Sequence, residues 1–352
     1  MNPKIIIDLS KLKANTRLLV DLCNANGIEP VGVTKAACGD PQVAQAMLDG
    51  GMQLLGESRL ENARRLRQGG ITVPLLLLRL PSPSQVAEVV KLFQCSLNSE
   101  LSTIKALNAA AAQVGLIHDI ILMVDLGDLR EGVWPDDLEA TVQELKALQH
   151  IRLLGLGTNL SCYGGVIPSQ DNLSRLLDYN RRAEMSYSRP LPVISGGNSS
   201  SLPLLLEGRM PPVTQLRLGE SIILGRETVA RQPIPGAHLD CFQLVAEVIE
   251  LKEKPSVPIG EIGQDAFGSA PVFDDRGIHR RAILALGRQD VVLNRLAPPF
   301  GVEILGGSSD HLLLDVSNYP APLTIGDCLT FNLGYGALLA AMTSAYISKE
   351  YL

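Results

Sequence analysis

The sequence predicts an α/β protein, a (β/α)8 TIM barrel followed by a C-terminal all-β domain. Up to about residue 230, short apolar runs alternate with amphipathic segments of ten or more residues, which is typical of βα units on a parallel sheet. Beyond Pro233-Ile-Pro-Gly, short Val/Ile/Leu runs are separated by Gly, Pro and Asp turns, which favours all-β structure. We therefore expect a barrel over residues 1–232 and a β-domain over residues 233–352. One continuous, irregular α/β domain is the alternative.

Eight βα units suit a closed barrel, at about the usual 250 residues. The eight predicted barrel strands are 30–35, 53–56, 74–78, 94–97, 119–125, 151–158, 192–195 and 215–218. The helix-like segments between them are 41–50, 57–68, 84–93, 100–114, 135–148, 171–185 and 199–207. The predicted strands of the β-domain are 242–251, 281–286, 302–305, 312–316 and 327–332.

Composition excludes several classes of protein. Lys and Arg number 31 against 37 Asp and Glu, so the net charge of −6 argues against a nucleic-acid binder. The apolar runs fall short of the roughly 20 residues of a membrane-spanning helix, and the N-terminus lacks the features of a signal peptide. We therefore expect a cytoplasmic protein with no membrane partner. The six cysteines and five histidines lack paired metal-ligand spacing, so we expect reduced thiols and no metal.

A lysine closes the first predicted strand. The active site of such a barrel lies at the carboxyl ends of its strands. Lys35 ends the run Val31-Gly-Val-Thr-Lys, and its amine would point into the mouth of the barrel. An amine in this position is suited to forming a Schiff base with a carbonyl compound. The alternative is a lysine that only reaches out to solvent at the rim.

Two later strand ends predict a phosphate site. The seventh strand runs into Ser195-Gly-Gly-Asn-Ser-Ser-Ser, where backbone N–H groups and hydroxyls at a helix start suit an anion, although an ordinary N-cap turn is the alternative. The eighth strand ends in Arg217-Leu-Gly-Glu-Ser. Loops after strands seven and eight are the frequent phosphate site of this barrel, so the two signals support each other.

Two further residues follow the fifth and sixth strands. Arg130 is a fixed cation that suits a carboxylate or a phenolate, and a structural Asp125–Arg130 pair is the alternative. Asn159 is placed to lie over a flat ligand. A strand-one lysine, a phosphate site and two arginines, Arg130 and Arg217, together describe a pyridoxal phosphate enzyme.

With these residues in view, the sequence resembles the alanine racemase-like, fold-type III pyridoxal phosphate enzymes, in particular the ornithine racemase branch. The resemblance covers nearly the whole chain. Its motifs are Ile7-Asp-Leu-Ser-Lys-Leu, Asp125-Leu-Gly-Asp-Leu-Arg-Glu-Gly, Ser195-Gly-Gly-Asn-Ser-Ser-Ser, Arg217-Leu-Gly-Glu-Ser, Leu224-Gly-Arg-Glu-Thr, Gly263-Gln-Asp-Ala-Phe-Gly, Gly306-Gly-Ser-Ser-Asp-His-Leu and Leu333-Gly-Tyr-Gly-Ala.

The resemblance implies a role for each matched residue. Lys35 would carry the cofactor and act as one of two proton-transferring bases. Arg217 would hydrogen-bond the pyridine nitrogen, and because arginine keeps its proton, α-proton exchange is favoured over decarboxylation and transamination. Arg130 would lie near the phenolic oxygen and the substrate carboxylate, and Asn159 stands where alanine racemases have a histidine stacked on the ring. The remaining cofactor-binding residues implied are Asn198, Ser199, Gly219, Glu220, Ser221 and Tyr346.

The second base departs from the family pattern. Alanine racemases use a tyrosine from the partner subunit's β-domain, and residues 257–263 contain none. Asp265 is the leading substitute, with His311 and Tyr335 behind it, and a surface aspartate in a Gly-rich turn is the alternative. The resemblance also implies a homodimer with shared active sites.

The pair Ser309-Asp310 bears on the choice of substrate. Decarboxylases of basic amino acids with this fold have a Cys-Asp pair at the comparable position, whose aspartate meets the distal amine of the substrate. Asp310 therefore favours ornithine or another basic amino acid, unless it only holds a loop. The missing cysteine argues against a decarboxylase. The residues also leave open a broad-specificity alanine/lysine racemase, a non-catalytic cofactor carrier, and a dehydrogenase or sugar-phosphate enzyme.

Overall fold

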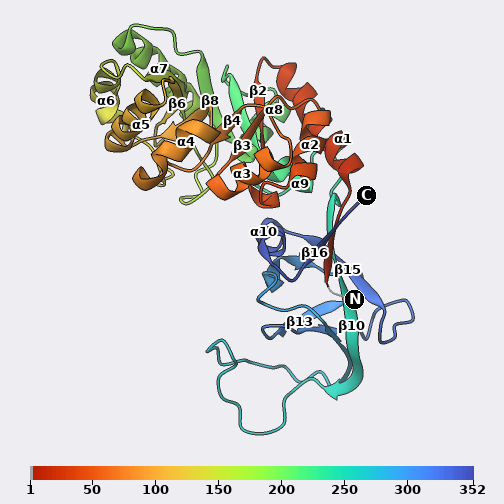
Figure 1. Cartoon of the computed structure of the whole chain (residues 1–352). Helices are drawn as coiled ribbons and strands as arrows, with labels where there is room; N and C mark the ends of the chain where they lie inside the picture. The colour runs from red at the N-terminus through yellow and green to blue at the C-terminus, as the bar shows by residue number, and fades with distance from the viewer. Residues whose placement is uncertain (1–2) are drawn as a thin grey trace. The chain divides into compact units, whose positions relative to one another are not determined.

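The computed structural model describes residues 3–352 and divides the chain into two compact units (Figure 1). The barrel unit is Leu9–Leu239, and the β unit joins the N-terminal segment up to Asp8 to Asp240–Leu352. The boundary therefore lies at 239/240 instead of 232/233. The N-terminal segment, which the sequence assigns to the barrel, belongs to the β unit because strand β1 (Lys4–Ile7) pairs with β10 (Phe242–Pro255).

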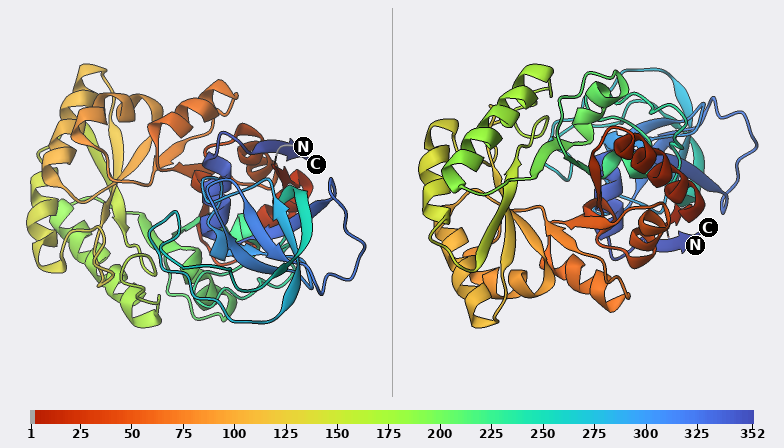
Figure 2. Two further views of the ribbon diagram at one scale, coloured as in Figure 1. Left: turned by 90° about the horizontal axis from the view of Figure 1, so that it is seen from below. Right: turned by 90° about the horizontal axis from the view of Figure 1, so that it is seen from above.

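Eight parallel strands close the barrel, which confirms the predicted fold class (Figure 2). The last strand pairs with the first in parallel register, Val31 beside Arg217. Apolar side chains such as Val31, Leu76 and Ile121, each 1% exposed or less, fill a core cluster among the strands. The strands are β2 (Glu29–Val33), β3 (Leu54–Glu57), β4 (Leu75–Leu77), β5 (Cys95–Asn98), β6 (His118–Met123), β7 (Ile151–Gly157), β8 (Val193–Asn198) and β9 (Gln215–Leu218).

Helices connect the barrel strands, and local caps fix where they begin. The Asp40 side chain accepts hydrogen bonds from the backbone N–H groups of Gln42 and Val43, and Ser169 forms a capping box with Asn172. No helix among residues 3–352 is long and apolar enough to cross a membrane. The helices are α1 (Leu9–Asn24), α2 (Pro41–Asp49), α3 (Leu60–Gln68), α4 (Val86–Leu92), α5 (Leu101–Gln113), α6 (Leu138–Leu145), α7 (Gln170–Tyr187), α8 (Leu202–Leu206) and α9 (Glu220–Leu224).

Two strand ends differ from the predicted ranges, and both carry candidate site residues. Strand β2 stops at Val33 because Thr34 adopts a helical backbone (φ −89°, ψ −2°), so Lys35 begins the short 3-10 helix η1 (Lys35–Ala37). Strand β8 continues to Asn198, beyond the predicted end at residue 195. Gly197 makes that extension possible with φ of 112°, a conformation that favours glycine.

The β unit is built on a mostly antiparallel sheet in the order β12-β15-β10-β11-β14-β13. Strand β1 adds to β10 and pairs in parallel with β16 (Ser348–Tyr351). The five predicted strands are found, whereas β1, β12 and β16 were missed because they are only two to four residues long and their partners are distant in sequence. The other elements are β11 (Ile278–Leu284), β12 (Leu296–Ala297), β13 (Glu303–Gly307), β14 (Leu312–Asp315), β15 (Cys328–Leu333) and α10 (Tyr335–Thr343).

Candidate active site

Lys35 extends from a rigid backbone at the carboxyl end of β2. Its residue is half-buried, whereas Ala36 and Ala37 behind it are buried. The buried Thr34 hydroxyl donates to Glu57 Oε2 over 2.9 Å, which ties the residue before the lysine to the end of β3. Burial raises the pKa of Glu57, and hydrogen bonds to its carboxyl group from Ser58, Asn62 and Thr34 lower it by less.

Two serines join the loops that follow β8 and β9. The Oγ atoms of Ser199 and Ser221 lie 2.9 Å apart, and both residues are buried. The backbone N–H groups of Gly219 and Ser221 donate to Ser199 Oγ over 3.4 and 3.3 Å. A Cβ at Gly219 would lie 3.0 Å from Val33 Cβ, so glycine permits this close approach to β2. Hydroxyls and backbone donors thus gather at one point, as phosphate binding requires.

Asn198 and Glu220 stand beside this pair of serines. Asn198 Oδ1 accepts from Ser200 N–H over 2.8 Å, which caps the short helix of serines. Burial raises the pKa of Glu220, while Arg231, Arg226 and the Lys35 ammonium lower it by less. Because β2 and β9 are neighbouring parallel strands and Gly219 lies close to Val33, Lys35 and the serine pair lie at the same end of the barrel.

Arg217 is the buried cation of the site, at 4% exposed. Its guanidinium donates to Ser195 Oγ and, over 2.7 Å, to the carbonyl of Thr158. Burial lowers the pKa of Arg217 to about 10, so it remains protonated at neutral pH. These bonds fix the guanidinium on β9, which pairs with β2.

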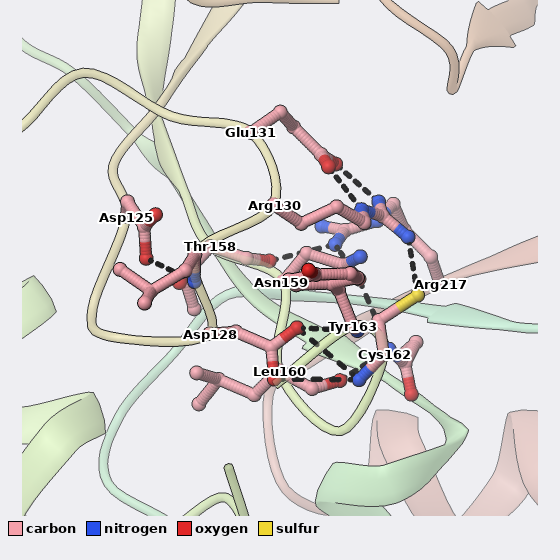
Figure 3. Close-up of polar contacts among 12 residues, drawn as sticks. Asp125, Asp128, Arg130, Glu131, Thr158, Asn159, Leu160, Cys162, Tyr163 and Arg217 are labelled. Atoms are coloured by element: carbon pink, nitrogen blue, oxygen red, sulfur yellow. Dashed lines mark hydrogen bonds and ion pairs between the residues drawn. The ribbon is translucent and has the colours of Figure 1, made fainter. Parts of the chain in front are cut away.

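Arg130 lies in a cluster of polar side chains drawn in Figure 3. Its guanidinium donates to both carboxylate oxygens of Glu131 and to Cys162 Sγ. The Asp125–Arg130 pair that the sequence allowed is not formed, since Asp125 accepts from its own loop, from Gly127 N–H over 2.8 Å. The Asn159 carboxamide lies between Asn198 Nδ2, 3.0 Å away, and the guanidinium groups of Arg130 and Arg217.

Asp128 connects the loop of Arg130 to the loop of Asn159. Its carboxylate, in a residue that is 1% exposed, accepts from the backbone N–H groups of Cys162, Tyr163 and Val166 over 2.9–3.4 Å (Figure 3). Sequence reasoning missed Asp128 and Glu131, although both fall inside the motif around Arg130. The sequence signal that could have identified them is a pair of acidic residues close to an arginine just after a predicted strand.

Asp265 belongs to the β unit, in the connection between β10 and β11. Its Oδ1 accepts from the backbone N–H groups of Phe267 and Ser269, each over 2.9 Å, so the carboxylate shapes a tight turn. These backbone bonds lower the pKa of Asp265. The other candidate bases are His311, which contacts Ser308 Oγ at 3.3 Å, and Tyr335, which begins α10.

Ser309, Asp310 and Tyr346 also lie in the β unit and are exposed. The Ser309 hydroxyl donates to Asp310 Oδ1 over 2.8 Å, and this bond lowers the pKa of Asp310. The structure thus brings the predicted barrel residues together, whereas Asp265, Ser309, Asp310 and Tyr346 stand on a separate compact unit.

The barrel residues fit pyridoxal phosphate. The serine pair with its backbone donors suits the phosphate, the buried Arg217 suits the ring nitrogen, and the half-buried Lys35 suits the aldehyde. Within residues 3–352, no group of three or more His, Cys, Asp or Glu is arranged to hold a metal ion. Fold and site together define a class of barrel proteins that present a lysine and a cluster of hydroxyl and backbone N–H groups at one end of the barrel.

Comparisons with known proteins identify the family. The model of the alanine racemase N-terminal domain matches residues 7–227, and the chain belongs to this family. It is 45% identical to the ornithine racemase of Acetoanaerobium sticklandii over 100% of both chains. It is 41% identical to the lysine racemase of Thermotoga maritima over 99% of this chain and 98% of that protein.

Solved structures show the same fold. The alanine racemase of Streptomyces lavendulae superimposes with a TM-score of 0.76 at 18% identity, covering 100% of this chain and 97% of that one. The alanine racemase of Bartonella henselae, solved with covalently bound pyridoxal phosphate, gives a TM-score of 0.76 at 16% identity over 100% of both chains.

Proposed function

We propose that the protein is a pyridoxal phosphate-dependent racemase that interconverts L- and D-ornithine by moving the α-proton. The observation that carries this proposal is a half-buried lysine and a buried arginine at one end of the barrel, in a chain 45% identical over its whole length to an ornithine racemase. The full-length likeness to a lysine racemase supports lysine as a second substrate.

The barrel residues hold the reactants and move one proton. The bound cofactor supplies an electron sink that makes the α-proton acidic. Lys35 would hold the cofactor and exchange the proton on one face of Cα. Ser199 and Ser221, whose hydroxyls lie together, would bind the phosphate, the fixed Arg217 would donate to the ring nitrogen, and Arg130 would bind the α-carboxylate of the substrate. Because Arg217 keeps its proton at neutral pH, a ring nitrogen that accepts from it would stay unprotonated, which would restrain side reactions.

Racemisation requires a second base on the opposite face of Cα. We assign this role to Asp265, a half-buried carboxylate that the backbone N–H groups of Phe267 and Ser269 hold in place. In this proposal the β unit of one subunit completes the barrel site of another, so the working enzyme is a homodimer. We expect it in the cytoplasm.

The test incubates the purified holoenzyme with L-ornithine in heavy water and follows optical rotation and α-deuterium together. Loss of rotation with deuterium uptake is the expected result. Deuterium uptake at constant rotation would contradict the second base and leave Lys35 acting alone. Borohydride reduction followed by peptide mass mapping should place the cofactor on Lys35, and an unmodified Lys35 would overturn the cofactor assignment.

A further inference from the structure

We propose that Glu131 determines the preference for basic amino acids, by accepting the distal ammonium of a substrate whose α-carboxylate binds Arg130. This inference rests on the proposed function, in which Arg130 receives that carboxylate. It places the specificity-determining carboxylate in the barrel, whereas the sequence motif points to Asp310 in the β unit.

Without substrate, Arg130 forms an ion pair with Glu131. Both carboxylate oxygens of Glu131 accept from Arg130, one from Nε and one from Nη2, in the paired geometry of a strong ion pair (Figure 3). Burial lowers the pKa of Arg130, but Glu131 and Cys162 raise it by more. The Glu131 side chain is 13% exposed, whereas that of Arg130 is 37% exposed, so the carboxylate is largely shielded from water while the guanidinium stays open to an incoming carboxylate. Arg130 is therefore already neutralised when substrate arrives.

Substrate binding replaces Glu131 as the partner of the Arg130 guanidinium. The α-carboxylate of any amino acid must compete with Glu131 for the guanidinium. A neutral amino acid such as alanine would leave Glu131 largely buried with no cation, which is unfavourable. Ornithine brings its own cation on a short side chain. Its carboxylate can pair with Arg130 while its distal ammonium pairs with Glu131, so every charge keeps a partner.

The other acids near the barrel mouth already have partners of their own. Asp125 and Asp128 accept backbone N–H groups of the loops that follow β6 and β7. Glu220 pairs with Arg231, which is 55% exposed. Glu131 is the acid among these four whose partner is the guanidinium assigned to the substrate. Its release by substrate is therefore coupled to binding itself.

The experiment measures kcat and KM of Glu131→Gln for L-ornithine and L-alanine. The expected result is a fall in the ornithine-to-alanine ratio of kcat/KM by at least about tenfold. The KM for ornithine should rise, whereas the KM for alanine should stay equal or fall because Arg130 is no longer occupied. An excess of L-ornithine should also raise the Tm of Glu131→Gln by less than that of the wild type.

Two matched variants sharpen the result. Asp119, near the start of β6 and 18% exposed, also accepts from an arginine, Arg152, with both carboxylate oxygens, and Asp119→Asn should leave the ratio of the two substrates unchanged. Asp310→Asn tests the rival carboxylate. An unchanged ratio in Glu131→Gln, or a collapse of the ratio in Asp310→Asn alone, would overturn the inference while leaving the racemase proposal intact.

A failure of the proposed function looks different, since the wild type would then racemise neither amino acid, and that outcome overturns both proposals. If Glu131→Gln does not fold, Glu131→Asp carries the test, because it keeps the charge and shortens its reach. Glu131→Asp should raise the KM for ornithine and leave the KM for alanine unchanged, and equal changes for both substrates would refute the role of Glu131.

Discussion

The barrel mouth and the exposed segments of the β unit hold their functional side chains in different ways. Arg217 is 4% exposed and is fixed by Ser195 and Thr158, which lie on other strand ends. The Asp265 carboxylate accepts hydrogen bonds from the backbone N–H groups of Phe267 and Ser269, which belong to its own turn. Side chains held by several distant elements are set before any ligand binds, whereas those on a local turn depend on what packs over them. Substitutions of such buried barrel side chains should therefore lower stability as well as activity, whereas substitutions in the exposed turns of the β unit should affect activity alone.

The largest effect should come from Lys35→Ala. This change removes both the cofactor link and one base, so racemisation and the absorbance of the lysine-bound cofactor should disappear. Racemisation assays and absorbance spectra check this prediction. Lys105→Ala is the matched control, because Lys105 is 52% exposed and pairs with the exposed Glu144. Retained turnover in Lys35→Ala would refute the assignment.

Asp265→Asn should follow, with racemisation reduced by about 10²-fold or more and Tm unchanged. The asparagine can still accept the two backbone N–H bonds of the turn, but it cannot take a proton. Exchange of the α-proton by Lys35 should continue, so deuterium uptake from one enantiomer should fall less than racemisation. Asp274→Asn, in the same connection, is the control. Equal small losses in the two variants would move the second base to His311 or Tyr335.

Asp128→Asn should have a mixed effect, because the barrel loops depend on a buried carboxylate. In asparagine, an amide nitrogen that cannot accept a hydrogen bond replaces one of the two carboxylate oxygens. The backbone N–H of Tyr163 or of Val166 then loses its acceptor, so the free energy of unfolding should fall by about 2 kcal/mol. The loop of Arg130 should loosen, and the KM for substrate should rise several-fold. Denaturant titration and steady-state kinetics measure both. Asp178→Asn, 67% exposed, should change neither, and a stable Asp128→Asn would contradict the anchoring role.

The smallest effect concerns the pH dependence of stability at Glu57. Its folded-state pKa is raised, so between its unfolded pKa and that raised value the folded protein binds more protons than the unfolded chain. The stability contribution of Glu57 is therefore largest at low pH and is lost as pH rises through this window. Glu57→Gln resembles the protonated acid and should flatten that loss in unfolding titrations from about pH 4 to about pH 8. If the stability profile of Glu57→Gln instead runs parallel to that of the wild type, Glu57 is ionised in the folded protein throughout this pH range.

Much of the barrel could be predicted because its signals are local. Each strand is a short apolar run, and the rule that active sites lie at strand ends was enough to single out Lys35, Ser199 and Arg217. The β1 strand could not be predicted, because its partners are distant in sequence: Lys4 pairs with Val245 and, at the opposite end of the chain, with Ser348. The sequence also did not identify Glu131 as the partner of Arg130. Asp125 and Glu131 are both close to Arg130 along the chain, so distance in sequence does not distinguish them.

The sequence by itself determined the order of the eight barrel strands and of the helices between them, the two-part organisation, and which residues stand near the ends of the barrel strands. Hydrophobic periodicity and turn chemistry are properties of neighbouring residues, so they can be read along the chain. Only the tertiary structure decided that Arg130 pairs with Glu131, that Asp128 joins two loops, and that burial shifts the pKa values of Glu57 and Arg217. These depend on distances between separate loops and on exclusion of water, which exist only once the barrel has closed.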